Sequence, residues 1–166
     1  MRLGAYPFPM RRLKKHLPDA VWLAYLLVML WLLFLQRQPR FLDMPYAECL
    51  RTGLELMPFR ATRRYLYIAR HHSLWTAVVY LGGNLLCFVP LGFLLPCRHA
   101  RLRRFGPLLL CAASVIVLVE LTQLFTTLGF CDVDDLLFNL TGAALGYALW
   151  SRPWMRRRLE RHGWLT

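Results

Sequence analysis

The chain has 166 residues, 57% of them apolar, and a formal charge of +12 at pH 7. This length suits one domain, and four long apolar runs account for the high apolar fraction, so the composition excludes an ordinary soluble protein. The basic residues lie between the runs and follow no motif that could enter a nucleic-acid groove, so we expect no nucleic-acid partner. Anchoring to anionic lipid and orientation of the chain explain the charge instead.

A basic leader, residues 1–19, precedes the first apolar run at 20–35. A basic segment followed by an apolar run is also typical of a signal peptide. However, no small-residue cleavage site follows this run, and the chain continues with QRQP at 36–39. We therefore predict an uncleaved first transmembrane helix over about residues 20–36.

The segment 37–73 mixes seven arginines with acidic and aromatic residues. Its stretch 46–57 predicts a short helix in the membrane interface, ended by Pro58. The pair His71 and His72 predicts no metal site, because adjacent helical side chains point about 100° apart and no third ligand has suitable spacing. Two interpretations of the arginines stay open: they bind something anionic, or the segment dips back into the interface.

Three further spans are predicted, over about residues 74–96, 107–127 and 133–150. The first of them contains Gly82, Gly83, Pro90 and Gly92, which favour a kink or a break. The turn 128–132 is so short that the last two spans should form a tight antiparallel hairpin. The predicted fold is an all-α, polytopic integral membrane protein with four transmembrane helices, a single membrane domain over 20–150 and a basic tail over 151–166.

The distribution of Lys and Arg predicts the topology. The leader holds five, the hinge 97–106 holds four, the tail holds five, and the turn 128–132 holds none. The positive-inside rule then places both termini in the cytoplasm.

Polar side chains lie inside the last three predicted spans. A charge in hydrocarbon costs about 2.5–3.5 kcal/mol on insertion scales, so such residues usually face other helices. Glu120 and Gln123 share one helix face because they are three residues apart. Helix rise and direction bring them to a depth similar to that of the start of the last span and of Asn84. The sequence therefore predicts a polar pocket made by Asn84, Glu120, Gln123, Asp132, Asp135 and Asn139.

Other interpretations of these residues stay open. Polar groups in membrane bundles also form interhelical hydrogen bonds, and acidic residues at 132, 134 and 135 suit the N-terminus of a helix. Gly142 and Gly146 continue the stripe of Asp135 and Asn139 at helical spacing, and they predict close helix packing. Glu120 and Asp135 are candidates for a catalytic acid/base pair.

Five cysteines occur without a CxxC motif. Cys49 and Cys131 could both lie outside the cytoplasm and form a disulfide, and the odd total leaves at least one thiol free unless chains are cross-linked.

Three stretches together resemble the signatures of VanZ-like membrane proteins: residues 84–93 (NLLCFVPLGF), 120–123 (ELTQ) and 132–142 (DVDDLLFNLTG). The resemblance covers about residues 54–150. The loop Leu56-Met57-Pro58-Phe59 resembles a further motif of the family, in which asparagine usually stands where this chain has Glu55. The namesake of the family is associated with lowered sensitivity to the glycopeptide antibiotic teicoplanin. The resemblance implies a membrane protein and names no substrate.

Our leading hypothesis is a protein of the cell envelope in the bacterial inner membrane. Its pocket in the outer leaflet would bind an anionic lipid or a lipid-linked envelope precursor, with the loop arginines facing the phosphates. An intramembrane enzyme that uses Glu120 and Asp135, or a purely structural membrane subunit, are the alternatives. We expect no cofactor and no metal, and the sequence leaves the oligomeric state open.

Overall fold

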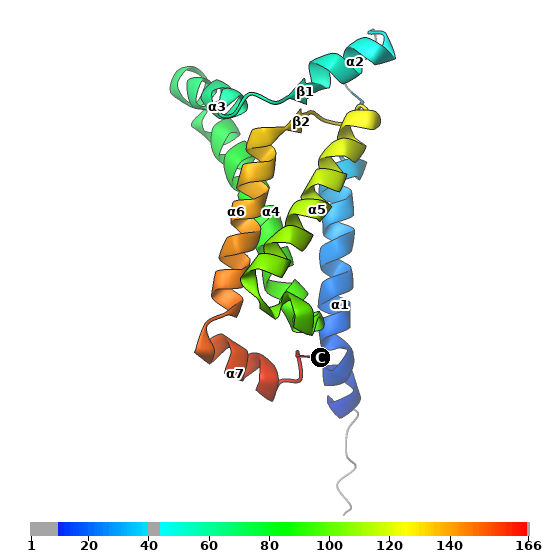
Figure 1. Cartoon of the computed structure of the whole chain (residues 1–166), viewed down its shortest axis with the longest axis vertical. Coiled ribbons are helices and arrows are strands. Elements are labelled where there is room, and N and C mark those ends of the chain that lie inside the picture. The colour runs from blue at the N-terminus through cyan, green and yellow to red at the C-terminus, as the bar shows by residue number, and fades with distance from the viewer. Residues whose placement is uncertain (1–9, 40–43, 166) are drawn as a thin grey trace, which may run out of the picture.

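The computed structural model describes residues 10–39 and 44–165. Within them the chain runs four times along the long axis of a helical bundle, through α1, α4, α5 and α6 (Figure 1). The start of α1 and the C-terminal helix α7 lie at one end of the bundle, and α2, α3 and both short strands lie at the other. The helices are α1 (Met10–Leu30), α2 (Tyr46–Gly53), α3 (Arg60–His71), α4 (Leu74–Arg98), α5 (Phe105–Phe125), α6 (Val133–Trp150) and α7 (Pro153–Arg161).

Three helical segments of the described chain are long and apolar enough to cross a membrane. They are His16–Leu35, α4 and α5, and the first of them ends in a π-helical turn, Trp31–Leu35. Large apolar side chains such as Leu27, Leu86 and Leu118 lie exposed on their outer faces, as in helices that face lipid. The chain is therefore a membrane protein. The fourth span predicted at 133–150 corresponds to α6, which is shorter and more polar, and its crossing of the membrane stays a prediction.

α4 differs from the expectation of a broken helix. It runs as one α-helix through Gly82, Gly83 and Pro90, because α6 packs along it and supports it. The two backbones come so close that a Cβ at Gly142 would lie 2.0 Å from the carbonyl oxygen of Leu85. A Cβ at Gly146 would likewise lie 2.0 Å from the carbonyl oxygen of Val89.

The last two spans, α5 and α6, pack against each other less closely than the predicted tight hairpin requires. α5 and α6 do contact each other, but α6 packs more extensively on α4. On α4 a Cβ at Gly92 would meet the Ala143 carbonyl oxygen at 1.8 Å, so small residues on both helices permit the approach. Sequence adjacency favoured α5 as the partner, whereas these small residues favour α4.

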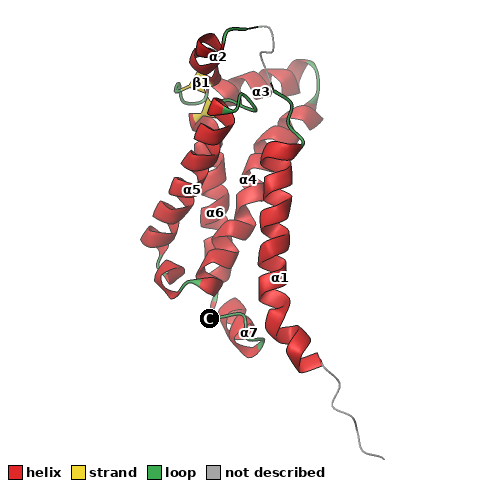
Figure 2. Ribbon diagram, turned by 90° about the vertical axis from the view of Figure 1, so that its right-hand side faces the viewer, coloured by secondary structure: helices red, strands yellow, loops and turns green. Residues whose placement is uncertain are grey.

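The core lies between α1, α4, α5 and α6. Figure 2 shows α1 and α4 side by side, and the Tyr25 hydroxyl of α1 donates to the Cys87 carbonyl of α4 at 3.1 Å. All five cysteines are free thiols, so the structure contains no Cys49–Cys131 bond. The buried apolar cluster consists of Met29, Leu33, Phe88, Leu91, Leu95, Leu108, Ala112, Ile116 and Ala143.

The segment between α1 and α4 is more ordered than the sequence predicts. The predicted helix at 46–57 ends earlier, at Gly53, because the chain then enters β1 (Leu54–Glu55). β1 pairs in parallel with β2 (Cys131–Asp132), which places Glu55 opposite Asp132. This pairing is the one departure from an all-α structure within the described residues. Of the seven arginines, Arg40 lies outside the described residues.

Candidate functional site

The three aspartates at the start of α6 have three different sets of partners. Asp132 caps the helix, because its Oδ1 accepts from the Asp134 N–H at 2.8 Å. The Asp134 carboxylate accepts from the Phe59 N–H at 2.5 Å and from the Thr62 N–H at 2.8 Å, so it holds the N-terminus of α3. Asp135 faces α4 instead. The sequence suggested helix capping for all three aspartates. In the structure Asp132 caps its own helix, α6, and Asp134 caps the N-terminus of a different helix, α3.

Asp135 is the centre of a hydrogen-bonded cluster, although it is only 7% exposed. Its Oδ1 accepts from the Tyr80 hydroxyl at 2.8 Å and from the side-chain amide of Asn84. The Tyr80 ring stacks on Tyr65 of α3, with centroids 3.6 Å apart and an angle of 14° between the planes. The two donors, one of them on a stacked ring, thus fix the position of the Asp135 carboxylate.

Glu120 approaches the same cluster from α5. The Asp132 backbone donates to its carboxylate, and Asp135 lies within electrostatic range. Its Oε2 is buried and, among the described residues, has no hydrogen-bond partner. Such a buried acceptor is costly unless a further donor reaches it, so this oxygen is a candidate contact for a ligand or water.

Gln123 and Asn139 do not join this cluster directly. Gln123 turns toward the π-helical turn that follows α1, where its Nε2 donates to the Leu33 carbonyl at 3.0 Å. The Asn139 side chain is 2% exposed, and its Oδ1 is buried without a partner in the described part of the chain. Gln123 thus joins two helices, whereas Asn139 offers an unused acceptor below Asp135.

A cavity of about 260 Å³ lies beside Asp135, under the strand pair. Glu55 stands at its wall, 3.3 Å from the Arg60 guanidinium and 4.0 Å from that of Arg64. Burial raises the pKa of Asp132 above its ordinary value, because loss of water disfavours the charged carboxylate. The lining residues are Arg37, Thr52, Glu55, Arg60, Ala61, Arg64, Tyr65, Tyr80, Phe130, Asp132 and Asp135. We call this space the headgroup cavity.

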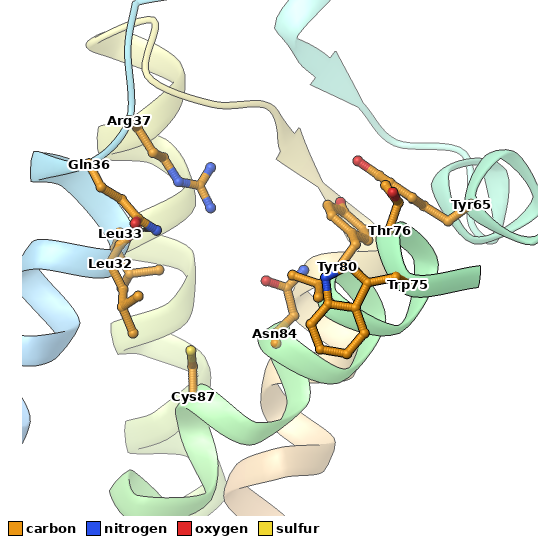
Figure 3. A pocket seen from close by; sticks show the side chains of 12 residues that line it. Leu32, Leu33, Gln36, Arg37, Tyr65, Trp75, Thr76, Tyr80, Asn84 and Cys87 are labelled. Atoms are coloured by element: carbon orange, nitrogen blue, oxygen red, sulfur yellow. Dashed lines mark hydrogen bonds between the residues drawn. The ribbon is translucent and has the colours of Figure 1, made fainter. Parts of the chain in front are cut away.

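A second space, about 480 Å³ in volume, lies between α4 and the end of the first span, residues 32–37, which continues α1. Figure 3 shows it with the Arg37 side chain extended from the end of the α1 segment toward α4. Arg37, Tyr65 and Tyr80 line both spaces, so the two spaces adjoin. The remaining lining residues are Leu32, Leu33, Gln36, Trp75, Thr76, Val79, Gly83, Asn84 and Cys87. We call this space the lateral groove.

Arg37 differs from the other arginines of the cavity. Arg60 and Arg64 pair with Glu55, whereas within the described ranges no carboxylate lies at ion-pairing distance from Arg37. Its guanidinium is nevertheless close enough to Glu120 and Asp135 to act on both electrostatically. A half-buried guanidinium with unused donors is a suitable partner for an anion.

The chemistry of the headgroup cavity is mixed. Three guanidinium groups can donate to phosphate oxygens, and three carboxylates, of Glu55, Asp132 and Asp135, can accept from hydroxyl or amine groups. In the part of the chain that the structure describes, no group of three or more His, Cys, Asp or Glu side chains is placed to hold a metal ion.

Several residues of the site were not predicted from the sequence. Tyr80 could have been found, because it precedes Asn84 by four residues and therefore shares its helix face. Tyr65, Arg60 and Arg64 depend on α3, a helix that the sequence analysis did not predict. Arg37 was not singled out from the sequence and was considered only as one of the seven arginines of segment 37–73.

Comparison with known proteins identifies one family. The family described as VanZ/LLP1 matches residues 22–156, which includes the last part of α1 as well as the expected region at 54–150. No curated protein matches the chain. No solved structure matches it either.

Proposed function

Because the chain belongs to the VanZ/LLP1 family, we propose that it is a cell-envelope protein that binds a phosphate-bearing lipid. The headgroup cavity would hold the polar part of an anionic lipid or of a lipid-linked envelope precursor. The membrane would be the bacterial inner membrane, with the cavity at the outer leaflet. The arginine distribution and the family membership support both assignments, and the experiments below test the ligand.

The observation that carries this proposal is the guanidinium of Arg37, which lies between the headgroup cavity and the lateral groove and, among the described residues, has no carboxylate at ion-pairing distance. A phosphate monoester or diester offers two oxygens, which match the planar fork of an arginine. Arg60 and Arg64 also line the cavity, from α3, with side chains 61% and 52% exposed, so they retain donors beyond those that face Glu55. A phosphate in the cavity would thus meet cationic groups from two elements, α3 and the end of the first span.

The carboxylates of the cavity support a headgroup that also carries hydroxyl or amine groups. Asp135 is held in place by Tyr80 and Asn84, so little reorganisation is needed before it accepts a further hydrogen bond. A lipid-linked sugar and a glycerol-based lipid both provide such donors. A link to teicoplanin sensitivity would follow if the bound lipid belonged to cell-wall synthesis.

Lipid competition measured by native mass spectrometry tests the proposal. Purified protein is offered dioleoyl phosphatidylglycerol, undecaprenyl phosphate and dioleoyl phosphatidylcholine in equal amounts. We expect one of the two anionic lipids to be retained in preference to phosphatidylcholine, and the identity of that lipid separates a bulk lipid from a lipid carrier. Arg37→Gln should remove about 1.5–3 kcal/mol of this preference, the contribution of a hydrogen bond to a charged group.

The matched control is Arg70→Gln, which removes an exposed arginine of α3 that does not line the cavity. If only the overall positive charge of the protein attracted anionic lipid, both substitutions would reduce the lipid preference equally. An equal effect of the two substitutions, or equal retention of all three lipids by the native chain, would contradict the proposal.

A second candidate function rests on the unpaired, buried Oε2 of Glu120 near Asp135. Two adjacent carboxylic groups could transfer a proton to or from a bound lipid as an acid/base pair. Glu120→Gln separates the candidates, because glutamine keeps the shape of the side chain and an acceptor for the Asp132 N–H. We expect this variant to bind lipid with a modest loss of affinity. Complete loss of a cellular phenotype with binding intact would favour the enzyme instead, and an unchanged phenotype would favour a purely structural role.

A further inference from the structure

We infer that the lateral groove between α4 and the end of the first span holds a hydrocarbon chain of the same phosphate-bearing lipid, which reaches the headgroup cavity sideways from the bilayer. This inference rests on the proposed function and adds the route and the place of the tail. The occupant is thus one hydrocarbon chain attached to a phosphate that lies beside Arg37.

The polarity of the groove changes along its length in the sense that a lipid requires. At the end of the bundle that carries α3, the lining includes the polar side chains of Arg37, Thr76 and Tyr80 beside Trp75 and Val79, with Asn84 one turn further along α4 (Figure 3). Beyond Asn84 the lining is apolar, with Cys87 on α4 and Leu32 and Leu33 on the π-helical turn. The polar part therefore adjoins the headgroup cavity, and the apolar part points toward the middle of the bundle. A lipid in one leaflet has the same orientation, with its phosphate near the surface and its chain toward the midplane.

The length of the groove agrees with one leaflet. Its lining residues on α4 extend from Trp75 to Cys87. At a rise of about 1.5 Å per residue this stretch covers about 18 Å, slightly more than half of a hydrocarbon core about 30 Å thick. A chain that starts at Arg37 and follows the groove would therefore end near the bilayer centre.

The groove stays open on its α4 side because of Gly83. A Cβ placed there would meet no atom within 4 Å, so the space is not filled by a neighbouring side chain. Gly82 is equally unobstructed but does not line the groove. The two adjacent glycines therefore provide a substitution that fills the groove and a matched substitution that does not.

The test uses photo-cross-linking with a phosphatidic acid that carries a diazirine in its acyl chain. Native protein, Gly83→Trp and Gly82→Trp are reconstituted in phosphatidylcholine nanodiscs with a small share of this probe. We expect cross-links to concentrate on the residues of the lateral groove. In Gly83→Trp they should fall to the level found on the lipid-facing surface of α5, and in Gly82→Trp they should be unchanged.

A second measurement needs no substitution and covers the case in which Gly83→Trp does not fold. Cys87 lines the groove, whereas Cys111 of α5 is similarly half-buried but does not. Dioleoyl phosphatidic acid should slow alkylation of Cys87 in the native chain and leave that of Cys111 unchanged, as quantified for each cysteine by peptide mass spectrometry.

Two results would overturn the inference. One is cross-linking in the groove that Gly83→Trp does not reduce, and the other is equal alkylation of Cys87 with and without phosphatidic acid. If the lipid-competition experiment meanwhile shows loss of binding in Arg37→Gln, the headgroup site stands and only the tail site fails. If the native chain does not prefer anionic lipid at all, the proposed function and this inference fail together.

Discussion

The Asp134 carboxylate of α6 accepts two hydrogen bonds from Thr62 of α3, one from its N–H at 2.8 Å and one from its hydroxyl at 2.9 Å. The interaction joins the loop segment to the last helix of the bundle and is almost fully buried at Asp134, which is 1% exposed. It keeps α3, and with it Arg60 and Arg64, above the headgroup cavity.

We therefore expect Asp134→Ala to release the N-terminus of α3. Removing the carboxylate leaves the Phe59 and Thr62 donors without their partner, which costs about 1–3 kcal/mol for an unsatisfied buried group. Asp134→Asn retains one acceptor and should cost less. Hydrogen exchange of the amides at 59–63 is the measurement, with Glu48→Ala, an exposed acid of α2, as the control. Unchanged exchange in Asp134→Ala would contradict this account of α3.

Gly142→Ala should destabilise the bundle, although alanine is the better helix former. Its methyl group would lie 2.0 Å from the Leu85 carbonyl oxygen, so α4 and α6 must move apart. Overpacking of this kind typically costs about 1–3 kcal/mol. The control is Gly82→Ala on α4, where the methyl group meets nothing and helix propensity alone should add up to about 1 kcal/mol. The midpoint of thermal unfolding in detergent should thus fall in Gly142→Ala and rise in Gly82→Ala. A shift of both midpoints in the same direction would exclude this packing argument.

The topology can be tested by cysteine accessibility in a chain whose native cysteines have been replaced. Ala100 and Thr126 are both exposed, and they follow the ends of α4 and α5 in the sequence. These two helix ends lie at opposite ends of the bundle (Figure 1). With the basic segments in the cytoplasm, a membrane-impermeant maleimide should label Thr126→Cys in intact cells and leave Ala100→Cys unlabelled. The reverse pattern would invert the protein and move the headgroup cavity to the inner leaflet.

Asp132 makes a prediction about pH. Its pKa is raised in the folded chain by burial, so the folded state binds a proton more readily than the unfolded state does. The contribution of this group to stability is then greatest below the unfolded pKa of about 3.9 and decreases as pH rises toward the folded pKa. Asp132→Asn keeps a capping oxygen and removes the titration. The thermal unfolding midpoint of Asp132→Asn minus that of the native chain should therefore increase from pH 4 to pH 7. A difference that stays constant over this range would contradict the prediction.

Helical spacing predicted which side chains lie near the site better than it predicted their hydrogen-bond partners. The pattern placed Asn84 and Asp135 at one depth, and the structure joins them by a hydrogen bond. The same pattern grouped Gln123 with them, yet that side chain reaches Leu33 instead. Spacing gives the relative direction of two side chains on one helix, but the rotation of the whole helix about its axis depends on packing with its neighbours.

The end of the bundle that carries α3 was least predictable. α3 is rich in arginine and depends on the Asp134 carboxylate, which lies far away in the sequence. The pairing of β1 with β2 involves only two residues on each strand, too few for a recognisable pattern of alternation. Three spans were evident from apolar length alone, because the bilayer requires about 20 apolar residues per helix.

The parallel pairing of Leu54 with Cys131 has a consequence for biogenesis. Membrane proteins are made from the N-terminus, so β1 leaves the ribosome well before its partner strand exists. Until the turn after α5 has emerged, neither Asp132 nor Asp134 is present to receive the loop, and the arginines of α3 have no cavity to cover. A nascent chain that stops after α5 would thus contain three apolar spans and most of the cationic groups but no binding site. The proposed lipid site can therefore form only after the start of α6 has been made, and an incomplete chain that stops before it would not hold lipid there.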